Sequence, residues 1–163
     1  MSDIKITGLE DLRSLLDTLP AKIELNAVRG GLRAGAKLIA DEAKRLCPEG
    51  GSNIPKGESP GELKDSIRVS MHSKRGHVTA TVKAGNNKAF YANMVEFGTA
   101  QHWIKPKNRK SLFLAGVFKE AIDHPGAQKH PFMRPAIDGK ANEAVEVIAN
   151  YMKNRIDKEI AKK

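Results

Sequence analysis

Hydrophobic residues recur at helical spacing in three parts of the chain. Leucines lie three or four positions apart between Leu9 and Leu19, which predicts a short amphipathic helix that ends at Pro20. Apolar residues then define one face of a helix over Ala21–Leu46. Pro135 suits the first position of a last helix, which continues with an apolar stripe at Ile137, Ala141, Val145, Ile148, Met152, Ile156 and Ile160.

Three glycines interrupt the helix predicted over Ala21–Leu46. Gly30, Gly31 and Gly35 each weaken a helix by about 1 kcal/mol relative to alanine. One interpretation is a flexible or kinked point in the helix. The other is close packing against a neighbouring helix or sheet, which small residues permit. The sequence leaves both interpretations open.

The middle of the chain alternates between apolar and polar residues, as a strand does. Ile67, Val69 and Met71 form one such run, the stretch 78–84 forms another, and turn-forming residues 73–76 join them. This pattern predicts an antiparallel β-hairpin with one buried face. The stretch Ser111–Ile122 suits a helix almost as well as a strand bent at Gly116. The turn residues that follow it favour the strand.

The segment Phe90–Thr99 holds several of the few aromatic residues. A short helix is expected over Ala89–Phe97, with Gly98 as its C-terminal stop. Phe90, Met94 and Phe97 share one face and are expected to point inward. Tyr91, Glu96 and Thr99 are then the exposed candidates for contact with a neighbouring subunit.

These elements predict an α+β fold: a small antiparallel sheet packed against a long N-terminal helix, with a C-terminal helix. Residues 1–163 are expected to form a single domain. Leu63–Ser66 is expected to be a turn of helix or the lead-in to a strand. Two flexible loops are expected at about 48–61, which is rich in Gly, Pro and Ser, and at about 100–110, which is basic.

Composition narrows the classes of protein. The chain carries a net charge of +9, spread along its length, and only 5% of its residues are aromatic. It contains no apolar run of 18 residues and no signal-peptide layout, so we expect no membrane contact and synthesis in the cytoplasm. Because Cys47 is the single cysteine, an internal disulfide is excluded. We expect Cys47 to be a small side chain packed in the core.

Candidate chemistry is sparse. None of the five histidines has a partner at the spacing of a zinc site, and no nucleophile motif occurs. We therefore expect no enzymatic activity, no cofactor and no metal. Trp103, followed by Lys105, Lys107, Arg109 and Lys110, could stack on a nucleic-acid base. It could equally anchor a protein contact. The protein contact is favoured, and a DNA-binding accessory protein is the alternative function.

Three motifs occur in a fixed order. They are Gly61-Glu62-Leu63-Lys64-Asp65-Ser66-Ile67, Tyr91-Ala92-Asn93-Met94-Val95-Glu96-Phe97-Gly98-Thr99 and Pro131-Phe132-Met133-Arg134-Pro135-Ala136. With its surrounding elements, this order resembles the small tail-component family of tailed bacteriophages, the tail-completion or head–tail joining proteins. The long loop Glu49–Pro60 and the basic stretch Lys105–Lys110 depart from the family pattern.

The resemblance implies a structural protein of the virion, in the neck or tail. It implies self-assembly into a ring, a hexamer being one candidate, at the tail end that faces the head connector. Expected partners are a tail-tube or terminator protein and a head-side connector or adaptor, while genomic DNA passes through without specific binding. The residues expected at assembly interfaces or in structural motifs are Tyr91, Glu96, Phe97, Gly98, Thr99, Trp103, Pro131, Phe132, Arg134 and Pro135.

Overall fold

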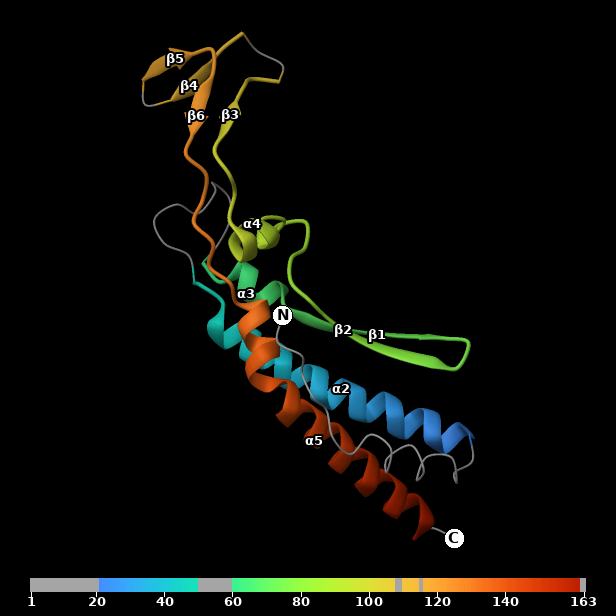
Figure 1. The fold of residues 1–163 in the computed structure, drawn as a ribbon. Helices are drawn as coiled ribbons and strands as arrows, with labels where there is room; N and C mark the ends of the chain where they lie inside the picture. Colours follow the sequence, from blue (N-terminus) through green and yellow to red (C-terminus); the bar gives the residue numbers. More distant parts are fainter. Residues whose placement is uncertain (1–20, 50–59, 108–109, 115, 162–163) are drawn as a thin grey trace.

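The computed structural model describes residues 21–49, 60–107, 110–114 and 116–161. Its helices are α2 (Ala21–Leu46), α3 (Glu62–Ser66), α4 (Ala92–Phe97) and α5 (Met133–Ile160). Its strands are β1 (Arg68–Lys74), β2 (His77–Lys83), β3 (His102–Ile104), β4 (Leu112–Leu114), β5 (Val117–Lys119) and β6 (Ile122–His124). The predicted α+β class is confirmed: a long helix stands at each end of the described chain, and the short antiparallel strands lie between them in chain order (Figure 1).

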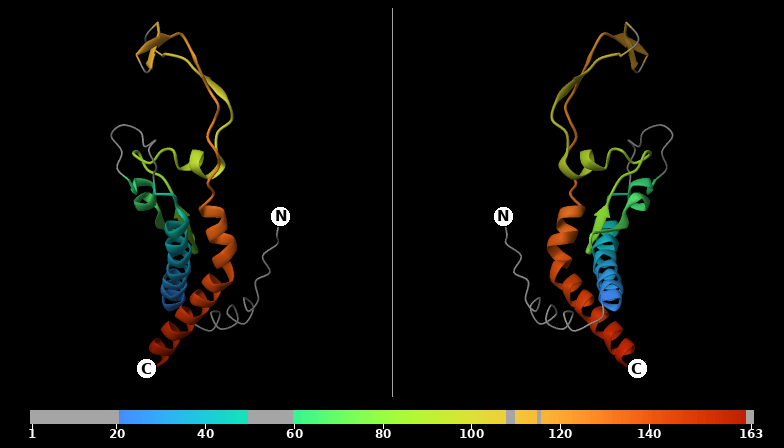
Figure 2. Two further views of the ribbon diagram at one scale, coloured as in Figure 1. Left: turned by 90° about the vertical axis from the view of Figure 1, so that its left-hand side faces the viewer. Right: turned by 90° about the vertical axis from the view of Figure 1, so that its right-hand side faces the viewer.

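The long helices α2 and α5 lie side by side (Figures 1 and 2). Helix α2 has the predicted bounds, and its glycines face α5. A Cβ atom on Gly35 would lie 2.6 Å from Ile148 Cγ1 and 2.8 Å from the carbonyl oxygen of Ala144. A Cβ atom on Gly31 would lie 2.9 Å from Met152 Cγ. Close helix packing is therefore the correct interpretation of these glycines.

The predicted hairpin is formed by β1 and β2, which pair antiparallel and lie against α2. Arg75 and Gly76 connect the strands, and both have positive φ angles (51° and 82°). A two-residue turn in which both residues have positive φ matches the right-handed twist of the strands in a hairpin. Val69 pairs with Val82, and Met71 pairs with Ala80. These apolar side chains are half-buried, so the hairpin has the expected inner face.

The core lies where the C-terminal end of α2, α3, α4 and the start of α5 meet. Phe132 and Ile67 are among the largest fully buried side chains, and small residues fill the space around them. The cluster comprises Ala40, Ala43, Cys47, Leu63, Ile67, Ala89, Ala92, Phe132 and Ala136. Cys47 is packed in this cluster as predicted. Its burial raises the pKa of the thiol to about 11, so Cys47 stays protonated at neutral pH.

Between α4 and α5 the chain leaves the body as two antiparallel segments, which we call the arm (Thr99–Ala127). Strand β3 pairs with β6 along the arm, and the hairpin β4–β5 forms its far end (Figures 1 and 2). Strand is thus the correct choice within Ser111–Ile122, although Gly116 (φ 86°) turns the chain between two strands rather than bending one. The predicted basic loop at 100–110 contains β3, because β6 supplies its hydrogen-bonding partner.

Helix α5 begins two residues earlier than predicted. Met133 is its first residue, and Pro135 lies within the first turn, where a missing N–H removes no helical hydrogen bond. Met152 and Ile156 are buried as predicted, but Ile137 is exposed and Ala136 is buried in its place. The predicted helix Leu9–Leu19 and most of the predicted loop 48–61 lie outside the described residues. No helix within the described ranges is long and apolar enough to cross a membrane.

Candidate assembly surface

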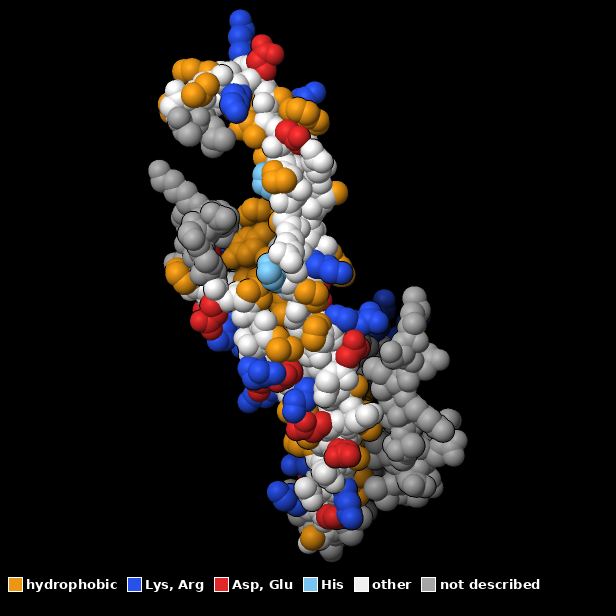
Figure 3. Space-filling model, turned by 60° about the vertical axis from the view of Figure 1, so that its left-hand side comes forward, with side chains coloured by type: hydrophobic (Ala, Val, Ile, Leu, Met, Phe, Trp, Pro, Cys, Tyr) orange, Lys and Arg blue, Asp and Glu red, His pale blue; other side chains and the backbone are white. Residues whose placement is uncertain are grey.

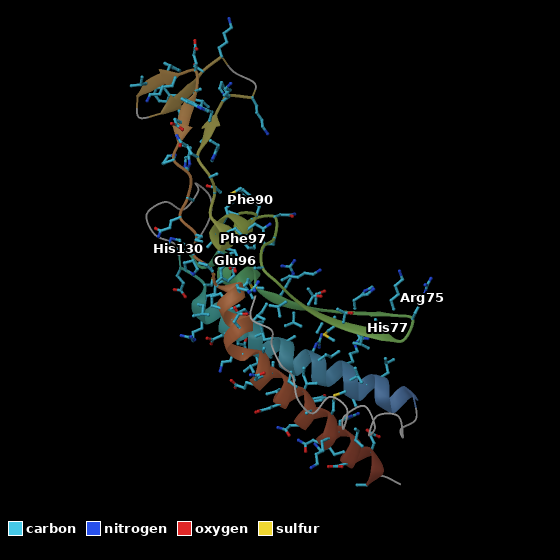
Figure 4. All side chains as sticks on the ribbon, in the orientation of Figure 1. Arg75, His77, Phe90, Glu96, Phe97 and His130 are labelled. Carbon is cyan, nitrogen blue, oxygen red and sulfur yellow. The ribbon has the colours of Figure 1, made fainter. Side chains whose placement is uncertain are left out.

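The carboxylate of Glu96 joins α4 to the beginning of α5. Its Oε2 accepts the backbone N–H groups of Phe132 (2.8 Å) and Met133 (2.9 Å), and its Oε1 accepts that of Arg134 (3.0 Å). These donors lack partners within the helix because they belong to its first turn. Glu96 therefore caps α5 from 36 or more residues earlier in the chain (Figure 4).

The environment of Glu96 determines its charge. Burial disfavours the ionised carboxylate, but the three backbone N–H groups favour it more strongly, so the pKa of Glu96 is lower than usual. The positive end of the α5 macrodipole acts in the same direction. Glu96 is thus a buried carboxylate anion at neutral pH, and it links the second motif, to which it belongs, to the third motif at the start of α5.

The predicted orientation of α4 is wrong. Phe90, Met94 and Phe97 were expected inside, yet their exposed fractions are 65%, 48% and 75%. Glu96 was expected outside and is 7% exposed. In Figure 4, Glu96 lies on the α5 side, and Phe90 and Phe97 lie further from the long helices. The first backbone N–H groups of α5 have no acceptor within the helix, so burying the Glu96 carboxylate against them is favourable. Leaving these buried donors without an acceptor would cost more free energy than exposing the aromatic rings.

Tyr91 and Thr99, also expected to be exposed, are partly buried. The Tyr91 ring contacts Phe90 edge to face, at 5.9 Å between ring centroids. Thr99 stands at the root of the arm, where its N–H donates to Ala127 O at 3.0 Å and Ala127 N–H donates to Thr99 O at 3.1 Å. The Thr99 hydroxyl also accepts the Ala127 N–H at 2.8 Å, so the side chain helps to support the arm.

Gly98 ends α4 as predicted and also makes the arm root possible. It has a φ of 72°, which favours glycine. A Cβ atom there would lie 2.7 Å from Ala127 O, and one on Gly126 would lie 2.1 Å from Thr99 O. The outgoing and returning segments of the arm therefore cross too closely for side chains at these two positions.

The fold brings the three motifs together around the core. Phe132 is fully buried beside Leu63 and Ile67 of the first motif. Pro131, Arg134 and Pro135 stay exposed at the surface of the same junction. Trp103 does not join them, because it lies on β3 in the arm and is 64% exposed.

Exposed apolar side chains occupy the arm and the surface at its root. At the far end, Phe113 and Phe118 are 66% and 71% exposed. At the root, a pocket of about 320 Å³ opens between the end of β2, α4 and the first turn of α5. Its lining is mainly apolar and includes Ala84, Ala92, Phe97, Phe132, Met133 and Ile137. Figure 3 shows hydrophobic side chains along the arm and in the hollow between arm and body.

The exposed aromatic end of the arm was not predicted from the sequence, although the sequence of β4 and β5 indicates it. Apolar residues occupy consecutive positions in β4 and again in β5. Successive residues in a strand point to opposite faces, so both faces of this hairpin are apolar. An isolated two-stranded hairpin cannot bury both.

The described residues give little support to a metal site. No group of three or more His, Cys, Asp or Glu side chains within them could hold a metal ion. His102 and His124 face each other across β3 and β6 with ring centroids 5.1 Å apart, but they are only two ligands. The prominent features are thus the capped junction, the projecting arm and their apolar surfaces.

The fold and these surfaces define a small α+β protein with an apolar β-arm. A family model described as "Bacteriophage HK97-gp10, putative tail-component" matches residues 10–98, more than half of the chain. The chain belongs to this HK97-gp10-like family of bacteriophage tail components. The match ends one residue before the arm begins. No curated protein and no solved structure matches the chain.

Proposed function

We propose that this protein is a tail-completion, or head–tail joining, component that assembles as a ring at the tail end facing the head connector. Its family membership supports a structural role in the virion. The observation that carries the proposal further is the pair of separate apolar surfaces on one chain, one at the end of the arm and one at its root.

A ring needs an interface made of two different patches on each subunit. A single self-complementary patch would stop at a dimer. The arm projects far from the body (Figure 1). One apolar patch lies at its far end, while the root pocket lies on the body. Subunits with this layout can associate head to tail, and a closed ring leaves neither patch exposed to water.

The proposed neighbours are a tail-tube or terminator protein on one side and a head-side connector or adaptor on the other. Genomic DNA would pass through the ring without specific binding. A strongly basic lumen would hinder sliding of the DNA, because phosphates bind lysine and arginine. The net charge of +9 therefore fits this role best if the basic residues of the arm face away from the lumen.

Native mass spectrometry can test the proposal with three purified components: this protein, the tail-tube protein and the connector encoded with it. The expected result is a closed oligomer of this chain that binds at least one of the two partners. A chain that stays monomeric and binds neither partner, at any salt concentration or protein ratio, would contradict the proposed function.

A second function, DNA binding by the arm, is favoured by one observation. Trp103 is exposed on β3, and the exposed lysines Lys105 and Lys107 follow it. An exposed aromatic ring next to cations can stack on bases and hold phosphates. Titration with DNA at two salt concentrations distinguishes this function, since phosphate contacts weaken steeply as salt rises. A salt-independent or undetectable affinity would exclude it.

A further inference from the structure

The far end of the arm presents a pair of phenylalanine rings. Phe113 of β4 stands directly opposite Phe118 of β5, and the ring centroids are 5.0 Å apart. We call these two side chains the aromatic knob. Two three-residue strands with no third strand are at best marginally stable in water. A knob that is about two-thirds exposed on such a hairpin would gain stability from a surface that covers it.

The root pocket has the size and chemistry to accept such a knob. A dry apolar cavity of about 150 Å³ holds one benzene ring, and the root pocket measures about 320 Å³. Phe97 and Ile137, at its edge, are themselves exposed and apolar. A phenyl ring entering the pocket would therefore cover these two side chains as well as itself.

The knob cannot reach the root pocket of its own chain. The stretch from Thr99 to Ile104 alone spans roughly 17 Å at about 3.3 Å per residue. The hairpin β4–β5 lies beyond it, at the end of the arm farthest from α5, in all views (Figures 1 and 2). A contact between knob and pocket must therefore join two molecules.

We propose that the aromatic knob of one copy docks in the root pocket of a second copy. This inference rests on the proposed ring, because knob and pocket are the two different patches that a head-to-tail interface requires. Charge favours this pairing over contact between two knobs. Lys110 and Lys119 are exposed within three residues of the knob in the chain and would repel a second tip. On α5, Asp138 pairs with Arg134, which lines the pocket, and Glu143 pairs with Lys140, so this surface carries balanced charge and does not repel the tip.

Disulfide trapping tests the contact without relying on stable rings. All chains carry Cys47→Ala, so that each has one engineered thiol. One chain carries Lys119→Cys beside the knob, and the other carries Asn93→Cys on the exposed wall of the pocket. The control partner carries Arg75→Cys in the exposed turn of β1–β2. Circular dichroism confirms that each chain is folded.

The mixed disulfide between Lys119→Cys and Asn93→Cys should form at least about tenfold faster than that with Arg75→Cys, the factor expected from burying one phenylalanine side chain. Adding Phe113→Ser and Phe118→Ser to the Lys119→Cys chain should abolish this excess. Equal rates for the two partners, or an excess that survives loss of both phenylalanines, would overturn the inference.

Native mass spectrometry of the Phe113→Ser/Phe118→Ser chain separates this inference from the proposed function. Rings lost in this variant but formed by the wild type support knob docking between copies. Rings that persist, with or without loss of tail-tube binding, overturn the docking inference and leave the ring intact. A wild-type chain that forms no ring and binds neither partner refutes the proposed function, even if trapping shows a pairwise contact.

Discussion

Glu96 accepts the backbone N–H of Phe132 at 2.8 Å, and this hydrogen bond links residues 36 positions apart. The same carboxylate holds the N–H groups of Met133 and Arg134. Glu96 belongs to the segment just before the arm, and Phe132 belongs to the segment just after it. The link therefore closes the base of the arm and fixes the beginning of α5 on the core.

Replacing Glu96 should destabilise the fold. Glu96→Ala leaves the first turn of α5 without its cap, and we expect the free energy of unfolding to fall by about 2–3 kcal/mol. Urea denaturation followed by circular dichroism measures this change. Glu143→Ala is the matched control, since Glu143 is half-exposed in a surface pair with Lys140 and should cost less than about 1 kcal/mol. Equal midpoints for Glu96→Ala and the wild type would show that the cap contributes nothing.

Acid should weaken the same link. The pKa of folded Glu96 lies below its ordinary value of 4.5, so its charged form stabilises the fold above about pH 4.5. This contribution is lost as the pH falls through the lowered pKa. The wild type should therefore exceed Glu96→Gln in stability at pH 7, and the difference should shrink toward pH 3. Other carboxylates, such as Glu42 beside Arg45, titrate equally in both chains, so their effects cancel in the stability difference. A difference that is constant between pH 7 and pH 3 would contradict this account.

The α2–α5 interface offers a contrast between two helical glycines. Gly35→Ala places a methyl group 2.6 Å from Ile148 Cγ1 and against the backbone of Ala144. Overpacking of this kind costs typically about 1–3 kcal/mol. Gly139, in α5, has open space around it, so Gly139→Ala should stabilise the protein by about 0.5–1 kcal/mol through helix propensity. Opposite shifts of the melting temperature are expected, and a higher melting temperature for Gly35→Ala would show that the helices can move apart.

The thiol of Cys47 should report on unfolding. It is 5% exposed, and burial raises its pKa to about 11. A thiol reagent needs both access and the thiolate, so labelling at pH 8 should be far slower in the native protein than in urea. In destabilised variants such as Glu96→Ala, the labelling rate under native conditions should rise in proportion to the unfolded population. Rapid labelling of the native wild type at pH 8 would show that the thiol is accessible.

The sequence predicted those elements whose signals are local. Helix α2 lies between Pro20 and Pro48 and has a regular apolar face, and the β1–β2 hairpin has alternating strands with a suitable turn. The orientation of α4 was not predictable in this way. Helical spacing groups Phe90, Met94 and Phe97 on one face but does not say whether that face is buried. The decisive donors are 36 to 38 residues away in the chain.

The arm was missed for a related reason. Its ladder pairs His102 with His124 and Ile104 with Ile122. Each strand has only three residues, so neither shows a clear alternation alone. The basic residues between them indicated a loop, and the strands form only because the chain returns beside itself. Long-range pairing of this kind leaves little trace in local periodicity.

At the arm root, the backbone segments at Thr99 and Gly126 approach too closely to admit a side chain. Two glycines with left-handed φ angles, Gly126 and Gly116, provide the test. Gly126→Ala adds a methyl group 2.1 Å from Thr99 O at a φ of 91°, whereas Gly116→Ala meets no atom within 4 Å at a φ of 86°. Both changes carry the cost of a left-handed alanine, about 1–2 kcal/mol, but only Gly126→Ala also forces the backbone segments apart. Hydrogen exchange of the Thr99 and Ala127 amides measures the opening of the root. Exchange should accelerate strongly in Gly126→Ala and stay near the wild-type rate in Gly116→Ala, because the β4–β5 turn lies at the opposite end of the arm. Equal protection of the two amides in both variants would mean that the crossing adjusts without opening.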